Sequence, residues 1–471
     1  MRKIFIETVG CPKNQEDSEK MAGLLKKSGH EITMQPDEAD VIIINTCGFI
    51  EDAKRESIET IFNYTHYKEL GKQLVVTGCL TQRYPDELAE ELPEADAILG
   101  VNDYERLPEI VSRHCEQSEE IRKQNIPVHT KGKPGIFTAP RAALSPRHSS
   151  YLKIAEGCSN RCAYCIIPDI RGPYRSVPME SLLDEAGELS AEGCKELILI
   201  AQDLTSYGRD LYGNYALADL LKKLCESDKT KDIEWIRLLY CYEERVTDEL
   251  IKVMADEQKI LKYMDIPLQH VNDRLLKNMR RSSTKESIRK TIAKLREKIP
   301  DIVLRTTFIT GLPGETEQDF EELYEFVLET RFDRLGVFAY SPEEGTDAAL
   351  MPDQVDREIS EARRDSLMRL QQQISLEKNR DLVGTVQDVI VDDFEDEEFN
   401  AKPAEHEKSC VYVGRTRADA PEIDGSVIFS APGIAIDDII GTIVKVRITD
   451  AFDYDLAGEY AQYKMKKTSI K

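Results

Sequence analysis

Short apolar runs, separated by longer segments of mixed polarity, characterise the first hundred residues. The runs "KIFIETVG" (3–10), "DVIIINT" (40–46) and "QLVVTG" (73–78) are typical of strands, and their nearly continuous apolar character indicates a parallel sheet buried on both faces. After the first run, Met21, Leu24 and Leu25 recur at helical spacing. The pattern predicts a small parallel α/β domain over residues 1–115.

The next segment, residues 116–150, interrupts this alternation. Its part 121–150 contains four prolines and six basic residues but no acidic residue. Proline interrupts both helices and sheets, so we expect a linker or a long covering loop. The basic side chains could contact nucleic acid, but a solvated linker is the simpler interpretation.

Six further apolar runs begin at Tyr151 and alternate with helical segments as far as about Arg380. Strand–helix alternation of this length predicts a partial (β/α)6 barrel over 151–380, with its chemistry at the carboxyl ends of the strands. The predicted strands are "YLKIA", "ELILIA", "EWIRLL", "KYMDIPL", "IVLRTTFI" and "RLGVFAY".

The C-terminal part changes to short β-type runs separated by Gly, Pro and Asp. These predict a small antiparallel β-barrel over 381–450, followed by a C-terminal tail over 451–471. Residues 380–447 contain seven Lys plus Arg against fifteen Asp plus Glu, and the whole chain has a net charge of −24. Such acidity opposes non-specific binding to phosphate backbones and favours a basic partner such as a ribosomal protein.

Composition also suggests where the protein resides. The N-terminus lacks an apolar signal segment, and no long apolar run is present, so we expect a cytoplasmic protein without membrane contact. Thiols stay reduced in that compartment. The eleven cysteines are therefore more readily explained as metal ligands, catalytic groups or core residues than as disulfides.

Three of these cysteines, Cys158, Cys162 and Cys165, lie in one loop directly after the run "YLKIA". A structural zinc ion normally takes four ligands. A cubane iron–sulfur cluster held by three thiolates instead leaves one iron open to an exogenous ligand, and soft thiolates suit iron. We therefore predict a cluster here, with a zinc loop that has a distant fourth ligand as the alternative.

Three other cysteines share a different feature, because Cys11, Cys47 and Cys79 each follow a predicted N-terminal strand. The carboxyl ends of neighbouring parallel strands meet at one crevice, so these thiols should meet and could hold a second cluster. The alternative is that each is a small buried hydrophobe. The remaining cysteines show no common spacing, and we assign them to packing or to the surface: Cys115, Cys194, Cys225, Cys241 and Cys410.

The C-x3-C-x2-C spacing, with Tyr164 before its last cysteine, resembles the signature of the radical S-adenosylmethionine (SAM) superfamily. The resemblance implies a partial barrel, a 4Fe–4S cluster whose open iron chelates SAM, and a 5′-deoxyadenosyl radical. The segment "TGLPGET" (310–316) resembles the SAM-contacting loop of that superfamily, in which Gly311 and Gly314 would let the backbone approach the adenosyl group. Tyr164 and Gln202 are expected to bind the cofactor as well, together with Gly311 and Gly314.

The domain order resembles the methylthiotransferase family, with a TRAM-type barrel at the C-terminus. The segments "GCPKN" (10–14), "NTCGFI" (45–50), "AQDLTSYG" (201–208) and "DIPLQH" (265–270) are similar to its RimO branch. That resemblance implies methylthiolation of an aspartate β-carbon in the twelfth small-subunit ribosomal protein. It also implies two 4Fe–4S clusters, two SAM molecules and an electron donor such as a flavodoxin or ferredoxin.

Two alternatives stay open at this point. One is a tRNA methylthiotransferase of the MiaB branch, which typically has Gln-Met where this chain has Pro12-Lys13. The other is a non-enzymatic iron–sulfur or zinc module that docks on the ribosome.

Several polar residues could assist the chemistry, although a structural role is the alternative for each. Two pairs, Gln202 with Asp203 and Gln269 with His270, end the second and fourth barrel strands and should face the top of the barrel. Arg305 lies within the fifth strand. Two further arginines in "RGPYRS" could steer an acidic side chain or be solvated. These residues are Gln202, Asp203, Gln269, His270, Arg305, Arg171 and Arg175.

Overall fold

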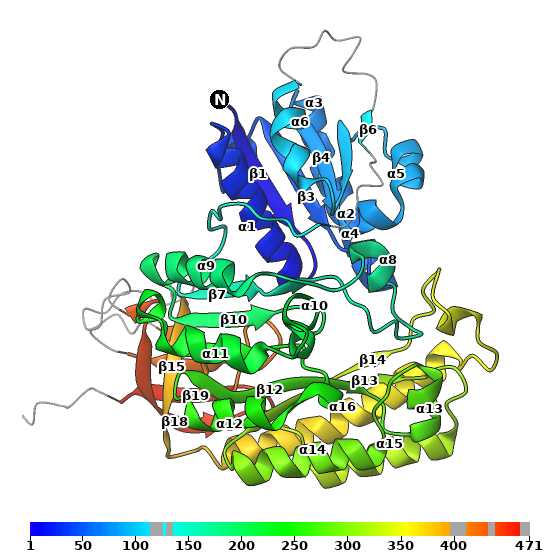
Figure 1. Cartoon of the computed structure of the whole chain (residues 1–471), viewed down its shortest axis with the longest axis vertical. Helices are drawn as coiled ribbons and strands as arrows, with labels where there is room; N and C mark the ends of the chain where they lie inside the picture. Colours follow the sequence, from blue (N-terminus) through cyan, green and yellow to red (C-terminus); the bar gives the residue numbers. More distant parts are fainter. Residues whose placement is uncertain (114–125, 129–134, 396–410, 432–438, 462–471) are drawn as a thin grey trace, which may run out of the picture.

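The computed structural model describes residues 1–113, 126–128, 135–395, 411–431 and 439–461. Figure 1 shows an N-terminal α/β domain (blue to cyan) at one end of the molecule, a larger strand–helix unit below it, and a small β-barrel (orange to red) against the side of that unit. None of the described helices combines the length and the apolarity that crossing a membrane requires.

The N-terminal domain is built on a six-stranded parallel sheet. Its strands are β1 (Lys3–Thr8), β2 (Glu31–Ile32), β3 (Val41–Thr46), β4 (Gln73–Gly78), β5 (Ala97–Gly100) and β6 (Ile126–Val128), and its helices are α1 (Pro12–Lys27), α2 (Glu51–Tyr64), α3 (His66–Glu69), α4 (Cys79–Arg83), α5 (Pro85–Glu91) and α6 (Leu107–Arg113). The strand order is β2-β1-β3-β4-β5-β6. Helices cover both faces, which explains why every residue of β3 and β4 is buried.

The predicted linker over 116–150 is partly wrong, because described parts of it belong to the N-terminal domain. Residues 126–128 form β6, which extends the sheet beside β5. Further along, Arg141 forms an ion pair with Glu19 of α1, and the Ala142 amide donates to the Glu19 carbonyl oxygen. Backbone hydrogen-bonding groups need partners, and here the sheet edge and α1 supply them.

The middle unit confirms the six predicted strands as one open parallel sheet. The strands are β7 (Ser149–Lys153), β10 (Glu196–Ile200), β11 (Trp235–Leu238), β12 (Ile260–Gln269), β13 (Val303–Thr310) and β14 (Arg334–Ala339), and a short hairpin of β8 (Ala155–Glu156) and β9 (Arg175–Ser176) follows β7. Their order is β14-β13-β12-β11-β10-β7. The sheet is therefore a partial barrel with β7 and β14 at its edges.

Helices cover the outside of this partial barrel (Figure 1). Their apolar faces and the strands form one continuous core. A capping box at Thr316 and Asp319 begins one of these helices, α15. The covering helices are α9 (Met179–Ala191), α11 (Leu217–Glu226), α12 (Asp248–Asp256), α14 (Lys285–Lys298), α15 (Glu317–Thr330) and α16 (Arg357–Arg380). The unit also contains the short helices α8 (Ile167–Arg171), α10 (Arg209–Tyr212) and α13 (Asp273–Asn278), of which α8 packs against α4 of the N-terminal domain.

The C-terminal unit is a closed barrel of β15 (Val386–Glu395), β16 (Val411–Thr416), β17 (Val427–Ser430), β18 (Ile443–Ala451) and β19 (Leu456–Tyr460). Its pairs are antiparallel except for β17 and β19, which run parallel. Because β19 closes the barrel, the predicted tail over 451–471 begins too early. Closure leaves no exposed strand edge, which accounts for the extra strand.

The C-terminal barrel packs against the amino-terminal halves of the larger barrel's strands. Buried ion pairs accompany this contact: Arg415 with Glu196 of β10, and Asp419 with Arg334 of β14. The carboxyl ends of the strands stay on the opposite side, where α1 of the N-terminal domain lies across β7 (Figure 1).

Candidate functional site

The loop after β8 holds Cys158, Cys162 and Cys165 at the carboxyl end of the barrel. Gly157 has a φ of +75°, and an added Cβ there would collide with the carbonyl oxygen of Pro173. The Cys158 amide donates to the Gly172 carbonyl oxygen, and the Cys165 amide donates to the Cys162 carbonyl oxygen at 3.0 Å. The backbone therefore folds the three positions into one compact turn.

Side chains from the following strands surround this loop. Asn160 donates to the Cys158 sulfur at 3.5 Å and to Asp203, which is 1% exposed. Arg245 pairs with the same carboxylate at 2.9 Å. The buried Asp203 thus holds the loop against the end of β10.

Two tyrosines and one arginine lie around Cys162. The Tyr242 hydroxyl is 3.7 Å from the Cys162 sulfur, and the Arg281 guanidinium lies 4.3 Å from the Tyr242 ring centroid. Tyr164 is partly buried, and its pKa is raised by burial and by the neighbouring Cys162. A thiolate at position 162 would therefore have two hydroxyl donors and one cation nearby.

The structure also brings Cys11, Cys47 and Cys79 together. They follow β1, β3 and β4, which are adjacent in the sheet and in register up to Asn45 and Gly78. The Asn14 Oδ1 atom lies 4.0 Å from the Cys11 sulfur and 3.8 Å from the Cys79 sulfur.

Local structure fixes each of these thiols. Cys11 is the N-cap of α1, where Pro12 begins the helix, and Cys79 is the first residue of α4. Ser57 of α2 holds the backbone of Cys47 through hydrogen bonds to both its amide and its carbonyl. Helix N-termini favour negative charge, so the Cys11 and Cys79 positions suit thiolates.

Both trios fit an iron–sulfur cluster in donor chemistry. Burial raises the pKa of Cys47 to about 12 and that of Cys158 to about 11, so the free thiols are protonated and a bound metal would displace those protons. Across the described ranges, no three His, Cys, Asp or Glu side chains converge on a single metal ion. The thiolates of a cubane bind separate irons, so they need not converge in that way.

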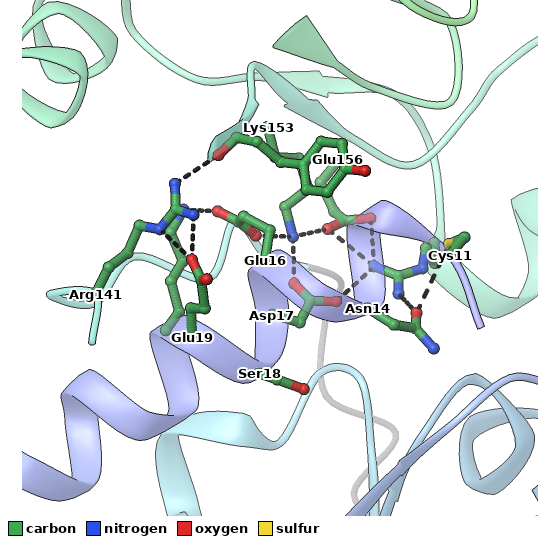
Figure 2. A network of polar contacts seen from close by, with 12 residues as sticks. Cys11, Asn14, Glu16, Asp17, Ser18, Glu19, Arg141, Lys153 and Glu156 are labelled. Carbon is green, nitrogen blue, oxygen red and sulfur yellow. Dashed lines mark hydrogen bonds and ion pairs between the residues drawn. The ribbon is translucent and has the colours of Figure 1, made fainter. Parts of the chain in front are cut away.

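A buried ionic network joins the two trios across the domain boundary. Arg171, at the end of α8, donates to Asn14 at 2.8 Å and pairs with Asp17 of α1 and Glu156 of β8. Lys153 pairs with the same two carboxylates. Figure 2 shows α1 carrying its half of this network toward the barrel.

The sequence left open that Arg171 is solvated. The structure excludes this alternative, because Arg171 is only 2% exposed. Burial raises the pKa of Glu156, but Lys153 and Arg171 outweigh burial and lower that pKa overall. Gln202 donates to Glu156 at 3.3 Å, while its own Oε1 atom is buried and has no hydrogen-bond partner among the described residues. The hydrogen bonds that Arg175 donates within the described part of the chain all go to backbone carbonyl oxygens.

The other predicted barrel residues have structural partners. Gln269 ends β12 with a φ of +71°, and the Nδ1 atom of the fully buried His270 accepts from the Asn272 amide. Arg305 pairs with Asp265 and with Asp424 of the C-terminal barrel. Arg305 therefore helps to dock the C-terminal barrel.

The loop after β13 uses its two glycines differently. Both have positive φ, +77° for Gly311 and +78° for Gly314. An added Cβ at Gly311 would collide with Ser360 of α16, whereas one at Gly314 would only touch the flexible Arg274 side chain at 3.4 Å. The requirement for glycine at 311 thus follows from the contact with α16, and the adenosyl approach stays a prediction.

Among the remaining cysteines, Cys194 and Cys241 are fully buried in the barrel core and Cys225 packs against it, as expected for packing residues. Cys115 and Cys410 lie outside the described residues.

Sequence reasoning missed Lys13, Asn14 and Arg281. Asn14 is one helical turn from Cys11, a spacing that could have indicated its contact with the thiol. Lys13 is 7% exposed, and its ammonium lies 3.1 Å from the Tyr240 ring centroid. Burial lowers the pKa of Lys13 to about 8, against an opposing effect of Cys11.

Family models match three parts of the chain. Residues 3–100 match the Uncharacterized protein family UPF0004, residues 152–327 the Radical SAM superfamily, and residues 383–460 the TRAM domain. Among solved structures, the radical SAM methyltransferase TsrM from Kitasatospora setae has a TM-score of 0.54 at 14% identity, covering 86% of this chain and 80% of that protein. This similarity concerns the fold alone.

Curated relatives match nearly the full length. A protein of Geotalea uraniireducens named ribosomal protein uS12 methylthiotransferase RimO is 48% identical, over 97% of this chain and 98% of the relative. One of the same name from Desulforamulus reducens is 47% identical over 98% and 100%. With the domain order and the barrel cysteine loop, these matches show that the chain belongs to the RimO family of radical SAM methylthiotransferases.

Proposed function

We propose that this enzyme transfers a methylthio group to the β-carbon of an aspartate in ribosomal protein uS12, the protein in the names of its relatives. The observation that carries the proposal is the pairing of two separate thiol trios through one buried network. A plain SAM methyltransferase needs neither trio.

SAM and 4Fe–4S clusters are the cofactors of this superfamily. We assign one cluster to Cys158, Cys162 and Cys165 and a second to Cys11, Cys47 and Cys79. When bound, such clusters together with SAM supply radical and sulfur chemistry that side chains lack.

The overall reaction replaces one C–H bond of the substrate by a C–S bond. One SAM donates its methyl group to sulfur. A second SAM is cleaved reductively to methionine and 5′-deoxyadenosine, which receives the substrate hydrogen, so oxidation of the carbon balances reduction of this SAM. The methyl-donating SAM leaves as S-adenosylhomocysteine, and the sulfur comes from an external source at the oxidation level of sulfide. A donor of the flavodoxin or ferredoxin class supplies one electron to start SAM cleavage, and one electron is released again when the C–S bond forms.

The chain's own residues hold the reacting groups and exclude water. Asp203 fixes the barrel loop, and Asn14 contacts two N-terminal thiols at once. Arg171 ties Asn14 to Glu156, immediately before the barrel loop. Acid–base catalysis cannot activate the substrate C–H bond. Holding the reacting groups rigidly in place is therefore the main contribution of the protein.

The acidic character of the chain supports a protein substrate over tRNA, because ribosomal proteins are basic and a net charge of −24 repels phosphate. Nucleic-acid contact through the TRAM-type barrel is a secondary interaction in this proposal. The curated names favour an enzyme over a non-enzymatic docking module.

Mass spectrometry of uS12 tests the proposal directly. The reconstituted enzyme, with SAM and reductant, should add one methylthio group to an aspartate of uS12, either free or within the small subunit. Bulk tRNA incubated in parallel should stay unmodified. Modification of an adenosine instead of uS12 would overturn the substrate assignment while leaving the chemistry intact.

A further inference from the structure

Lys13 is a buried cation that has no ionic partner in the structure. It lies in the first turn of α1, two residues after Cys11, and is 7% exposed. Within the described residues it makes neither a hydrogen bond nor an ion pair, and its ammonium instead lies over the ring of Tyr240. Tyr240 follows β11, so this contact joins the N-terminal domain to the carboxyl end of the barrel.

The carboxylates that influence Lys13 already have other cations. Asp265 and Glu156 both act on the ammonium electrostatically. Asp265 pairs with Arg305 and also accepts from the Tyr240 amide. Glu156 pairs with Lys153 and Arg171.

A buried ammonium without a paired anion is unfavourable, and an aromatic ring offsets only part of the lost hydration. The nearby carboxylates could have paired with Lys13, but they form their ion pairs with other cations. Such a position therefore suits an anion that arrives from outside the chain. The place is also chemically suitable, because it lies beside Cys11 at the barrel end that holds the other trio.

We propose that Lys13 binds the side-chain carboxylate of the substrate aspartate and so selects an acidic residue for modification. This inference rests on the proposed function and adds a residue that determines specificity. The carboxylate of aspartate is bonded directly to the β-carbon. An ammonium that holds the carboxylate therefore also fixes the position of the reacting C–H bond.

The test compares Lys13→Met, which removes the charge at similar length, with Lys13→Arg, which retains it. Each reconstituted enzyme receives uS12 with either Asp or Asn at the modified position. Lys13→Met should lower kcat/KM for the Asp substrate by about 100-fold, mainly through KM, because the buried charge pair is lost. Lys13→Arg should recover most of this loss, and the Asn substrate should react equally poorly with the wild type and Lys13→Met.

Binding and spectroscopy provide readouts that do not depend on turnover. The affinity of the loaded enzyme for Asp uS12, measured by fluorescence anisotropy, should fall with Lys13→Met, while iron content and the visible spectrum stay those of the wild type. Unfolding of the metal-free Lys13→Met protein should begin no earlier than that of the wild type, since an unpaired buried charge is removed. If that variant folds poorly, Lys13→Gln takes its place in every measurement.

The inference fails, while wild-type enzyme still modifies uS12, if the losses on the Asp and Asn substrates are equal or if the cluster spectrum changes, which would make Lys13 a partner of the cluster. Failure of the wild type to modify uS12 would instead refute the proposed function, and with it this role of Lys13. Tighter SAM binding by the wild type than by Lys13→Met, without uS12, would assign the lysine to the SAM carboxylate and also overturn the inference.

Discussion

The two cysteine trios occupy the same kind of place, the carboxyl ends of parallel strands, but they are built in different ways. The barrel trio comes from a single loop, so its spacing is set locally. The N-terminal trio comes from three strand ends and depends on the register of β1, β3 and β4. A short motif can therefore specify the first trio, whereas only a complete sheet can assemble the second.

The surroundings of the trios differ as well. Cys158 and Cys162 have partners from their own barrel, namely Asn160 and Tyr242. The N-terminal trio relies on Arg171, which belongs to the barrel and acts on Cys79. The surroundings of the N-terminal trio are thus complete only when the two domains pack together.

Removal of each trio in turn should give the largest effects. Replacement of Cys158, Cys162 and Cys165 by Ala should abolish SAM cleavage, and replacement of Cys11, Cys47 and Cys79 should spare SAM cleavage but stop methylthiolation. The iron content of the anaerobically purified protein should fall from about eight to about four atoms per chain in both variants. Product formation by the N-terminal triple variant would contradict the division of roles.

Loss of the interdomain cation should come next in size. Arg171→Met leaves Asp17 and Glu156 with less compensating charge, and breaking a buried pair costs about 3–5 kcal/mol of unfolding free energy. The visible and electron paramagnetic resonance spectra of the N-terminal cluster should change too. Denaturant unfolding and spectroscopy measure these effects.

Arg175→Met provides the matched control for Arg171, because Arg175 lies four residues away and forms no ion pair with a carboxylate among the described residues, its hydrogen bonds going to carbonyl oxygens. Its cost should stay within about 1 kcal/mol. Similar values for the two variants would show that the buried network does not support the N-terminal trio.

The glycine before Cys79 tests the role of strand-end geometry. Gly78 has a φ of +112°, and an added Cβ would collide with the Thr46 carbonyl oxygen. Gly78→Ala should cost about 2–4 kcal/mol, the sum of backbone strain and overpacking, and should lower the iron content of the N-terminal site.

Gly193→Ala is the control for Gly78, because Gly193 has a φ of +102° but open space around its added Cβ. Backbone strain alone should cost about 1–2 kcal/mol there. Thermal unfolding of the metal-free proteins separates the two contributions, and equal losses would exclude crowding as the cause.

Removal of a single asparagine side chain should give the smallest effects. The loss of unfolding free energy should be smaller at the barrel trio than at the N-terminal trio. Asn160→Ala removes a bond to Asp203 and should cost about 1 kcal/mol. Asn14→Ala should cost about 2–3 kcal/mol, because Asn14 is fully buried and donates to the carbonyl oxygens of Val9 and Thr46. The reverse order in denaturant unfolding would contradict the greater dependence of the N-terminal site on long-range contacts.

The sequence predicted β1, β3, β4 and the six strands of the partial barrel, because burial on both faces of a parallel sheet leaves an apolar run that local pattern can detect. It did not predict the shorter strands β2 and β5. It also predicted that Cys11, Cys47 and Cys79 would lie together, since consecutive parallel strands tend to be neighbours. It erred at 116–150 and at 451–471, where β6 and β19 are added to sheets by long-range pairing that local composition does not reveal.

The polar positions of α1 illustrate a second limit. Asn14, Glu16, Asp17 and Lys20 are polar in the sequence and buried in the structure. A helical pattern records which face is apolar, but it cannot show that a neighbouring domain will cover the polar face. The contacts of Arg171 were undetectable for the same reason.

By itself the sequence determined the parallel strands, the cysteine loop of the barrel and the family to which the chain belongs, because these depend on local spacing and on apolar runs. Only the tertiary structure decided which charges pair across the domain boundary, and that Lys13 has no ionic partner among the described residues. The physical reason is that the strength and pairing of a charge depend on burial and on distance, and residues far apart in the chain set both.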